Sequence, residues 1–176
     1  MNKKAEGLEQ LLPTFHGQGA QILAYVAAKG STTPDEIRKE LGIPRSTVYK
    51  LLSEFFRTGL AFKRKEGNTE KVIVPDFAFF IRNTAFIGEL KVTPRNVLAF
   101  DSAHTPAGKM FAERHGPAKF AQFVKLYDIY DRGNTTAQLM ARELEVSRYE
   151  VELLLSDIKS ITPVAMQIGG RPHRRQ

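Results

Sequence analysis

An internal repeat is the feature that most constrains the fold of this chain. When the sequence is shifted by 103 positions, residues 30–54 align with residues 133–157 without a gap, and ten of the 25 pairs are identical. Self-similarity of this kind is typical of a supersecondary unit that is used more than once in a chain. We therefore expect two copies of one helical unit, joined by a middle segment over residues 77–118.

Each copy carries the same predicted helix boundaries. A first helix, over about residues 20–29 or 119–132, ends at a glycine in a C-cap position, Gly30 or Gly133. A pair of threonines opens a second helix, and a three-residue turn separates it from a third. In the first copy the apolar residues of the third helix share one face at helical spacing: Val48, Leu51, Leu52 and Phe55. This order is that of a helix-turn-helix unit.

Capping boxes are predicted at two helix starts. In the first copy Thr33 and Glu36 have the required spacing, with proline in the first turn. In the second copy Ser147 and Glu150 have it. We expect Glu150 to act as a helix cap and not as a functional carboxylate.

A complete wing is predicted only after the first copy. Residues 60–65 and 70–74 have the composition of two short strands around a Gly-Asn turn, which predicts a β-hairpin. Residues 164–168 alternate like a strand, but Pro172 lacks a backbone donor, so the second wing is expected to be incomplete. The predicted fold class is mostly α with a small β wing: tandem helix-turn-helix units, the first a winged helix. The predicted parts are an N-terminal extension (1–19), the winged helix-turn-helix (20–76), a Phe-rich connecting segment (77–118), the second helix-turn-helix (119–168) and a basic tail (169–176).

Residues 42–49, followed by Leu51, Leu52 and the Gly59-Leu60 start of the wing, resemble the winged helix-turn-helix superfamily of prokaryotic and archaeal transcription regulators. Within it, the first copy is similar to the TrmB-like regulators. The resemblance covers residues 20–76 well and residues 119–168 more loosely. It implies a winged-helix fold and DNA binding, although winged helices also serve as protein-interaction modules.

The charge of the chain favours a polyanionic partner. The net charge is +7 and the isoelectric point is about 9.7, which points first to nucleic acid. Residues 20–76 hold ten Lys and Arg against seven Asp and Glu, whereas residues 119–159 hold six against seven. We therefore place the DNA contacts mainly on the first copy.

The candidate DNA-binding residues are hydrogen-bond donors and cations. On the third helix of the first copy they are Arg45, Ser46, Thr47, Tyr49 and Lys50, which suit a major groove. On the wing they are Lys63, Arg64, Lys65 and Lys71, which either reach the minor groove and phosphates or only protect an edge strand. Arg174 and Arg175 would form a phosphate-binding tail, and Arg148 of the second copy could also touch DNA.

The corresponding face of the second copy is less suited to DNA. Glu152 would be repelled by phosphates, whereas Tyr149 and Leu153 would gain free energy by burial against protein. We predict a protein interface at Tyr149 and Leu153, made with a second subunit or with the middle segment. A symmetric homodimer is the simplest arrangement, because it would match a palindromic DNA site.

The middle segment is rich in phenylalanine. We expect its rings to form a core that joins the two copies. The alternative is an exposed apolar helix that dimerises. The phenylalanines are Phe77, Phe79, Phe80, Phe86, Phe100 and Phe111.

Few features support catalysis or a cofactor. The chain has no cysteine, and its four histidines show no metal-ligand spacing to one another. No paired-carboxylate motif, phosphate-binding glycine loop or nucleophile elbow is recognisable, so we expect neither an enzyme nor a metal site. No apolar run approaches the length of a membrane span and no signal peptide is visible, so we expect a cytoplasmic, nucleoid-associated protein.

The function predicted from the sequence is sequence-specific binding of double-stranded DNA, as a transcription regulator. One alternative within that class is an initiator of plasmid or viral replication. From a different class, the two units would be protein-interaction modules of a transcription or chromosome assembly.

Overall fold

A computed structural model of the chain describes residues 16–82, 89–163 and 166. Its elements are, in order, α2 (Gln18–Lys29), α3 (Pro34–Leu41), α4 (Arg45–Thr58), β1 (Phe62–Glu66), β2 (Thr69–Ile73), β3 (Phe79–Arg82), β4 (Glu89–Val92), α5 (Val97–Asp101), the 3₁₀ turn η3 (Ser102–His104), α6 (Pro106–His115), α7 (Pro117–Asp131), α8 (Ala137–Leu144) and α9 (Arg148–Ile161). The mostly α fold with tandem helix-turn-helix units, the first of them winged, is confirmed. Among the helices that the structure describes, none combines the length and the apolar character that a bilayer span requires.

Local signals in the sequence explain the helices of the first unit. The Thr33 hydroxyl accepts the Glu36 N–H at the start of α3, and the helix ends at Gly42 in the left-handed conformation (φ 65°). The predicted capping box is only half formed, because the Glu36 carboxylate accepts a hydrogen bond from Thr32 Oγ1 (2.8 Å) instead of turning back to the cap. The α4 helix packs on α3 and β1, buries Val48, Leu52 and Phe55, and ends at Gly59 (φ 80°).

The wing is a tight antiparallel hairpin attached to the helices. The register pairs Phe62 with Ile73 and Glu66 with Thr69, so Gly67 (φ 64°) and Asn68 form the turn. Thr32, which lies between α2 and α3, adds a bridge to Val72 through two backbone hydrogen bonds of 3.2 and 2.6 Å. This bridge holds the base of the wing beside the helix-turn-helix.

The middle segment has more structure than the sequence predicted. A second hairpin, β3 paired with β4, is followed by α5, η3 and α6. Phe111 is buried in the core, and Phe77 and Phe100 pack against that core, as expected for a shared core. Phe86 lies outside the described residues, and the side chains of Phe79 and Phe80 are not described.

The second unit, α7 to α9, repeats the turn geometry of the first. Thr136 caps α8, and Ser147 and Glu150 form the complete capping box that the sequence predicted. Glu145 adopts the left-handed conformation (φ 57°) at the position where the first copy has Gly42. The predicted strand over residues 164–168 lies outside the described residues except for Met166.

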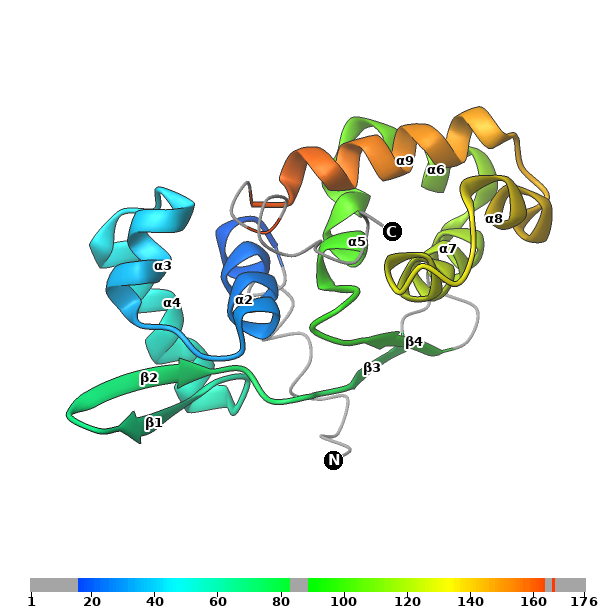
Figure 1. Cartoon of the computed structure of the whole chain (residues 1–176). Helices are drawn as coiled ribbons and strands as arrows, with labels where there is room; N and C mark the ends of the chain where they lie inside the picture. Colours follow the sequence, from blue (N-terminus) through cyan, green and yellow to red (C-terminus); the bar gives the residue numbers. More distant parts are fainter. Residues whose placement is uncertain (1–15, 83–88, 164–165, 167–176) are drawn as a thin grey trace.

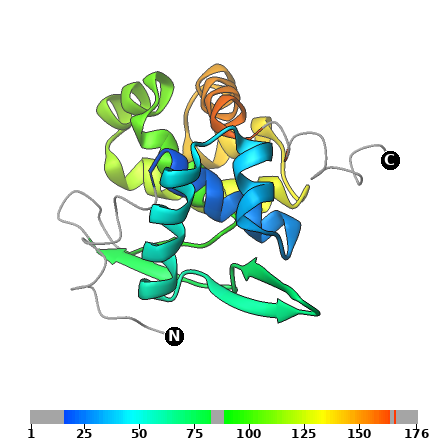
Figure 2. The same ribbon diagram turned by 90° about the vertical axis from the view of Figure 1, so that its left-hand side faces the viewer.

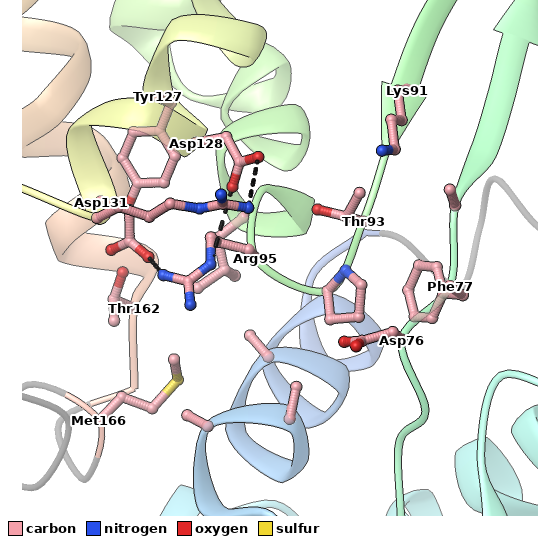
Figure 3. A pocket seen from close by; sticks show the side chains of 17 residues that line it. Asp76, Phe77, Lys91, Thr93, Arg95, Tyr127, Asp128, Asp131, Thr162 and Met166 are labelled. Carbon is pink, nitrogen blue, oxygen red and sulfur yellow. Dashed lines mark hydrogen bonds and ion pairs between the residues drawn. The ribbon is translucent and has the colours of Figure 1, made fainter. Parts of the chain in front are cut away.

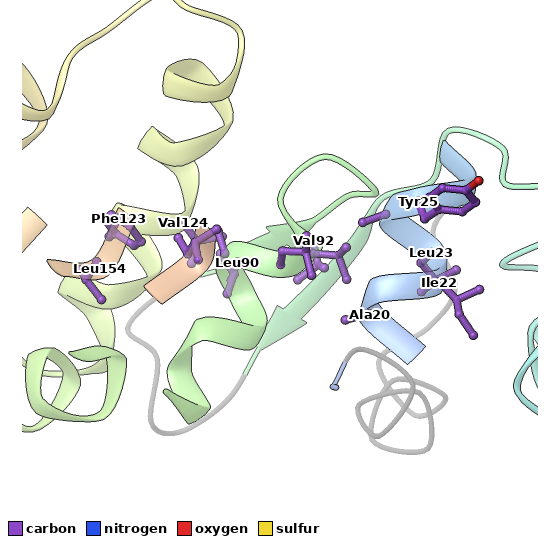
Figure 4. Packing of buried hydrophobic residues seen from close by; sticks show 14 of the residues in the cluster. Ala20, Ile22, Leu23, Tyr25, Leu90, Val92, Phe123, Val124 and Leu154 are labelled. Atoms are coloured by element: carbon purple, nitrogen blue, oxygen red, sulfur yellow. The ribbon is translucent and has the colours of Figure 1, made fainter. Parts of the chain in front are cut away.

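A single hydrophobic core joins the two units. The α2 helix of the first unit packs against α5, and α5 in turn contacts α7 and α9 of the second. In Figure 1 the wing with α3 and α4 stands at one end, α6 to α9 stand at the other, and α2 and α5 lie between them. Figure 4 follows this core from Leu23 on α2 through Val92 to Phe123 on α7 and Leu154 on α9.

Candidate nucleic-acid interface

The α4 helix presents the predicted donors on its outer face. Arg45, Ser46, Lys50 and Ser53 are exposed, and Thr47 is half-buried. Tyr49 is also exposed, and the Arg45 guanidinium lies over its ring, 5.4 Å from the centroid. This cation–π contact holds two predicted DNA-binding side chains together at the start of the helix.

The N-terminus of α4 is open to an anion, whereas that of α9 is closed. Pro44 occupies the N-cap of α4, and no described side chain caps the helix. At α9 the Ser147 hydroxyl and the Glu150 carboxylate already occupy the cap. Because a helix N-terminus carries partial positive charge, the first unit can accept a phosphate at a place where the second holds its own carboxylate.

The two faces of the wing differ in how far their cations are neutralised. Arg64 forms an ion pair with Glu66 (3.0 Å), and the Lys71 Nζ lies 4.0 Å from the Glu36 carboxylate. These two cations lie directly opposite each other in the hairpin. Lys63 and Lys65 alternate with Arg64 and therefore point to the other face, where neither has an ion pair with a described residue.

A groove of about 320 Å³ connects the α4 helix with the wing. Tyr49, Ser53 and Phe56 line it from α4, and Lys63 and Lys71 line it from the hairpin. The Lys63 Nζ lies 5.3 Å from the centroid of the Phe56 ring. Figure 2 shows α3, α4 and the β1–β2 hairpin together on the side turned to the viewer. The groove thus brings one predicted helix residue, Tyr49, beside two predicted wing residues, Lys63 and Lys71, and the Glu70 carboxylate also lines it.

Glu150 fastens α9 to α6. Its Oε1 accepts hydrogen bonds from Arg114 (2.9 Å) and His115 (2.7 Å), and its Oε2 accepts the Ser147 N–H (3.1 Å). Burial alone would raise the pKa of Glu150, but the hydrogen bonds from His115, Ser147 and Arg114 outweigh it and lower the pKa to about 2. Glu150 therefore has a second role besides the predicted capping of α9: it attaches α9 to the middle segment.

The outer face of α9 stays uncovered. Tyr149 is 68% exposed and Leu153 is 37% exposed. The described residues of the middle segment leave both side chains exposed, and the contact with a second subunit stays a prediction. Arg148 is exposed but forms an ion pair with Glu152 at 2.8 Å, which lowers its availability to a phosphate.

A polar cavity of about 730 Å³ lies between the two units, and no sequence pattern predicts it. Residues from α2, from the segment after β2, from β4, α5 and α7 line it. Arg95 reaches across its rim to Asp131 (2.9 Å) and Asp128 (3.9 Å), as Figure 3 shows. Arg132 also pairs with Asp128 (3.4 Å), so two arginines of the lining lie beside the two aspartates of α7.

Comparisons with known proteins support the assignment of the first unit. Residues 15–76 match the model of a family described as sugar-specific transcriptional regulator TrmB. Residues 109–165 match the model of a family of unknown function, DUF7437. No curated protein and no solved structure gives a significant match to the chain. The first unit thus has a winged helix-turn-helix fold and is similar, over residues 15–76, to the TrmB family of transcriptional regulators.

The tail residues Arg174 and Arg175 lie outside the described residues. The remaining charged residues among the predicted contacts separate into two groups. Arg45, Lys50, Lys63 and Lys65 are exposed and have no ion pair with a described residue. Arg64, Lys71 and Arg148 are paired with carboxylates.

Proposed function

We propose that the protein is a transcription regulator that binds double-stranded DNA sequence-specifically through the first unit. The observation that carries the proposal is the groove between α4 and the wing, because it joins a helix with exposed donors to Lys63, a wing lysine that has no ion pair with a described residue. A major groove accepts one α-helix, and a hairpin beside that helix meets the neighbouring phosphates or minor groove.

Within this proposal the first turns of α4 read the bases. Arg45 can donate two parallel hydrogen bonds to a guanine, and Lys50, five residues further along α4, is also exposed. Ser46 and Thr47 donate to base edges or phosphates near the uncapped helix start. Tyr49 orients Arg45 through the contact between guanidinium and ring.

The wing supplies phosphate contacts. Lys63 and Lys65 are the main candidates, because they share the face that has no ion pairs with described residues. Arg64 and Lys71 would first have to leave Glu66 and Glu36, so their contribution to affinity is smaller. The tail residues Arg174 and Arg175 remain candidates for further phosphate contacts.

The second unit is proposed to form a symmetric homodimer through the α9 face with Tyr149 and Leu153. Support comes from its exposed apolar side chains and from the closed N-terminus of α9. The α9 helix carries two cations against three carboxylates, whereas α4 carries three cations against one. A dimer would place two α4 helices on one palindromic site.

The test of DNA reading begins with selection of bound duplexes from a random pool, followed by fluorescence anisotropy on the selected sequence at several salt concentrations. Arg45→Ala and Lys50→Ala should each weaken specific binding by about 1–3 kcal/mol. Lys125→Ala is the matched control, because this exposed lysine lies on α7. Affinity should fall steeply between about 50 and 200 mM salt. If both α4 variants bind the selected duplex as tightly as the parent protein does, α4 does not recognise the DNA sequence.

The test of the dimer is sedimentation of the double variant Leu153→Lys with Tyr149→Ser. Loss of the dimer with residual weak DNA binding would support the interface. Leu139→Lys is the control, since this exposed leucine lies on α8 and outside the proposed contact. A monomeric parent whose DNA affinity rises in the double variant would instead show that α9 is a second DNA reader.

A further inference from the structure

Two histidines far apart in the sequence converge on one carboxylate beside the start of α2. The Nδ1 atom of His16 lies 2.5 Å from Asp101 Oδ1, and the Nδ1 atom of His104 lies 3.4 Å from the same oxygen. The two imidazole rings lie against each other, with centroids 4.1 Å apart and ring planes tilted by 35°. One potential ligand atom from each of the three residues lies within 4.8 Å of the others.

The carboxylate at the centre of this cluster is held in place by the backbone. The Asp101 side chain is only 6% exposed. Its Oδ2 accepts the Gly17 N–H at 3.1 Å, which leaves Oδ1 facing the two imidazoles. In protein metal sites, a carboxylate that binds the ion is typically held in orientation by a hydrogen bond to its second oxygen.

We propose that His16, Asp101 and His104 bind a divalent first-row transition metal ion of the zinc type. Imidazole nitrogen and carboxylate oxygen are the ligand types that such ions accept, at about 2.0–2.2 Å. A tetrahedral ion with bonds of this length separates its ligand atoms by about 3.3 Å. The His104–Asp101 distance already has this value. His16 would move away by about 1 Å, and its Nδ1 would bind the ion in place of the contact with Asp101.

Both histidine rings are more than half exposed, so an ion can enter and a water molecule can complete its coordination. His104 Nδ1 also lies 3.3 Å from the Asp101 carbonyl, a contact that the ion would replace. His16 directly precedes the first helix of the winged unit, whereas Asp101 ends α5 and His104 belongs to η3. A bound ion would therefore tie the winged unit to the middle segment, and this inference does not depend on DNA binding.

The competing explanation is a hydrogen-bonded latch that holds no ion. In that case His16 donates to Asp101 and only fastens the chain ahead of α2. The latch and the metal site use the same residues but differ in whether the full-length protein takes up an ion. A titration with metal therefore separates them.

The experiment uses the full-length, tag-free protein and follows the visible absorption of Co²⁺, with Zn²⁺ as competitor in calorimetry. We expect one Co²⁺ per chain, displacement by Zn²⁺, and an upward shift of Tm with Zn²⁺. His16→Asn combined with His104→Asn should lower the affinity at least about tenfold. His115→Asn is the matched control, because His115 also contacts a carboxylate but lies outside the cluster. His173→Asn controls for the tail.

Three outcomes would overturn the site: no ligand-field absorption with the parent protein, equal Co²⁺ affinity of the double variant, or loss of binding in the His115 control. If the double variant does not fold, the parent protein decides the question by NMR. Zn²⁺ should then shift the imidazole ¹⁵N signals of His16 and His104 and leave that of His115 in place. The absence of such shifts at both residues would refute the proposal.

Discussion

Replacing Glu150 with glutamine should destabilise the protein in a way that depends on pH. The carboxylate is only 16% exposed and holds α6 and α9 together through Arg114 and His115. Its pKa falls from 4.5, the ordinary value for a glutamate, to about 2 in the folded protein. Since one pKa unit corresponds to about 1.4 kcal/mol, ionised Glu150 contributes on the order of 3 kcal/mol to the free energy of unfolding.

The sign of the pH dependence follows from the lowered pKa. A carboxyl whose folded pKa lies below its unfolded pKa stabilises the protein above the unfolded value. That contribution is lost as the pH falls through the folded value. The difference between parent and Glu150→Gln should therefore be about 2–3 kcal/mol at pH 7 and shrink to about half of that near pH 3.

Urea unfolding of both proteins at pH 7, 4 and 3 measures this difference directly. Other carboxyls titrate in the same range, but they titrate in both proteins and cancel in the comparison. Glu152→Gln is the matched control on the same helix, because its partner Arg148 is exposed and spaced i,i+4. That variant should lose no more than about 0.5 kcal/mol. A gap between parent and Glu150→Gln that is as large at pH 3 as at pH 7 would refute the reasoning.

Three further substitutions test the packing and the backbone. Glu145→Gly should stabilise the protein by about 0.5–1 kcal/mol in thermal or urea unfolding, because it relieves a left-handed residue (φ 57°) at the turn before α9. An unchanged free energy of unfolding would mean that interactions of the Glu145 side chain offset the cost of its left-handed backbone conformation. Gly108→Ala should prevent or strongly weaken folding, since the added Cβ would lie 1.8 Å from the Ser102 carbonyl oxygen; a normal Tm would contradict the close approach of α6 to η3. Phe55→Ala should cost about 3–5 kcal/mol, because this ring is fully buried between α4 and the rest of the first unit. A loss below 1 kcal/mol would show that this core is not packed as described.

Most of the local structure could be predicted from the sequence. The repeat, the order of the helices, the Gly-Asn wing turn and the capping box at Ser147 depend on residues within a few positions of one another. Periodicity and capping hydrogen bonds act over one or two helical turns, so neighbouring residues suffice to specify them. The exposed donors of α4 follow from the same argument, because the apolar stripe leaves only one face for them.

Only the tertiary structure decided which residue of each repeated pair is buried. The aligned helices carry Leu51-Leu52 and Leu154-Leu155, yet α4 buries Leu52 most fully and α9 buries Leu154. Each of the two helices packs on the helix before it, α3 or α8, but the other neighbours differ: α9 packs on α5 and α6, whereas α4 packs on β1. The two helices share a local pattern of apolar residues, but their different neighbours bury a different leucine of the pair in each unit.

Contacts between residues far apart in the sequence were also beyond prediction. Glu150 meets Arg114 and His115 across 36 and 35 positions, and His16 meets Asp101 across 85. No periodicity links such positions, since their distance in space depends on how the middle segment folds between the two units. The hairpin β3–β4 and the helices α5 and α6 set that distance. The repeat thus determined the two helical units, and the segment between them determined which polar groups of those units come together.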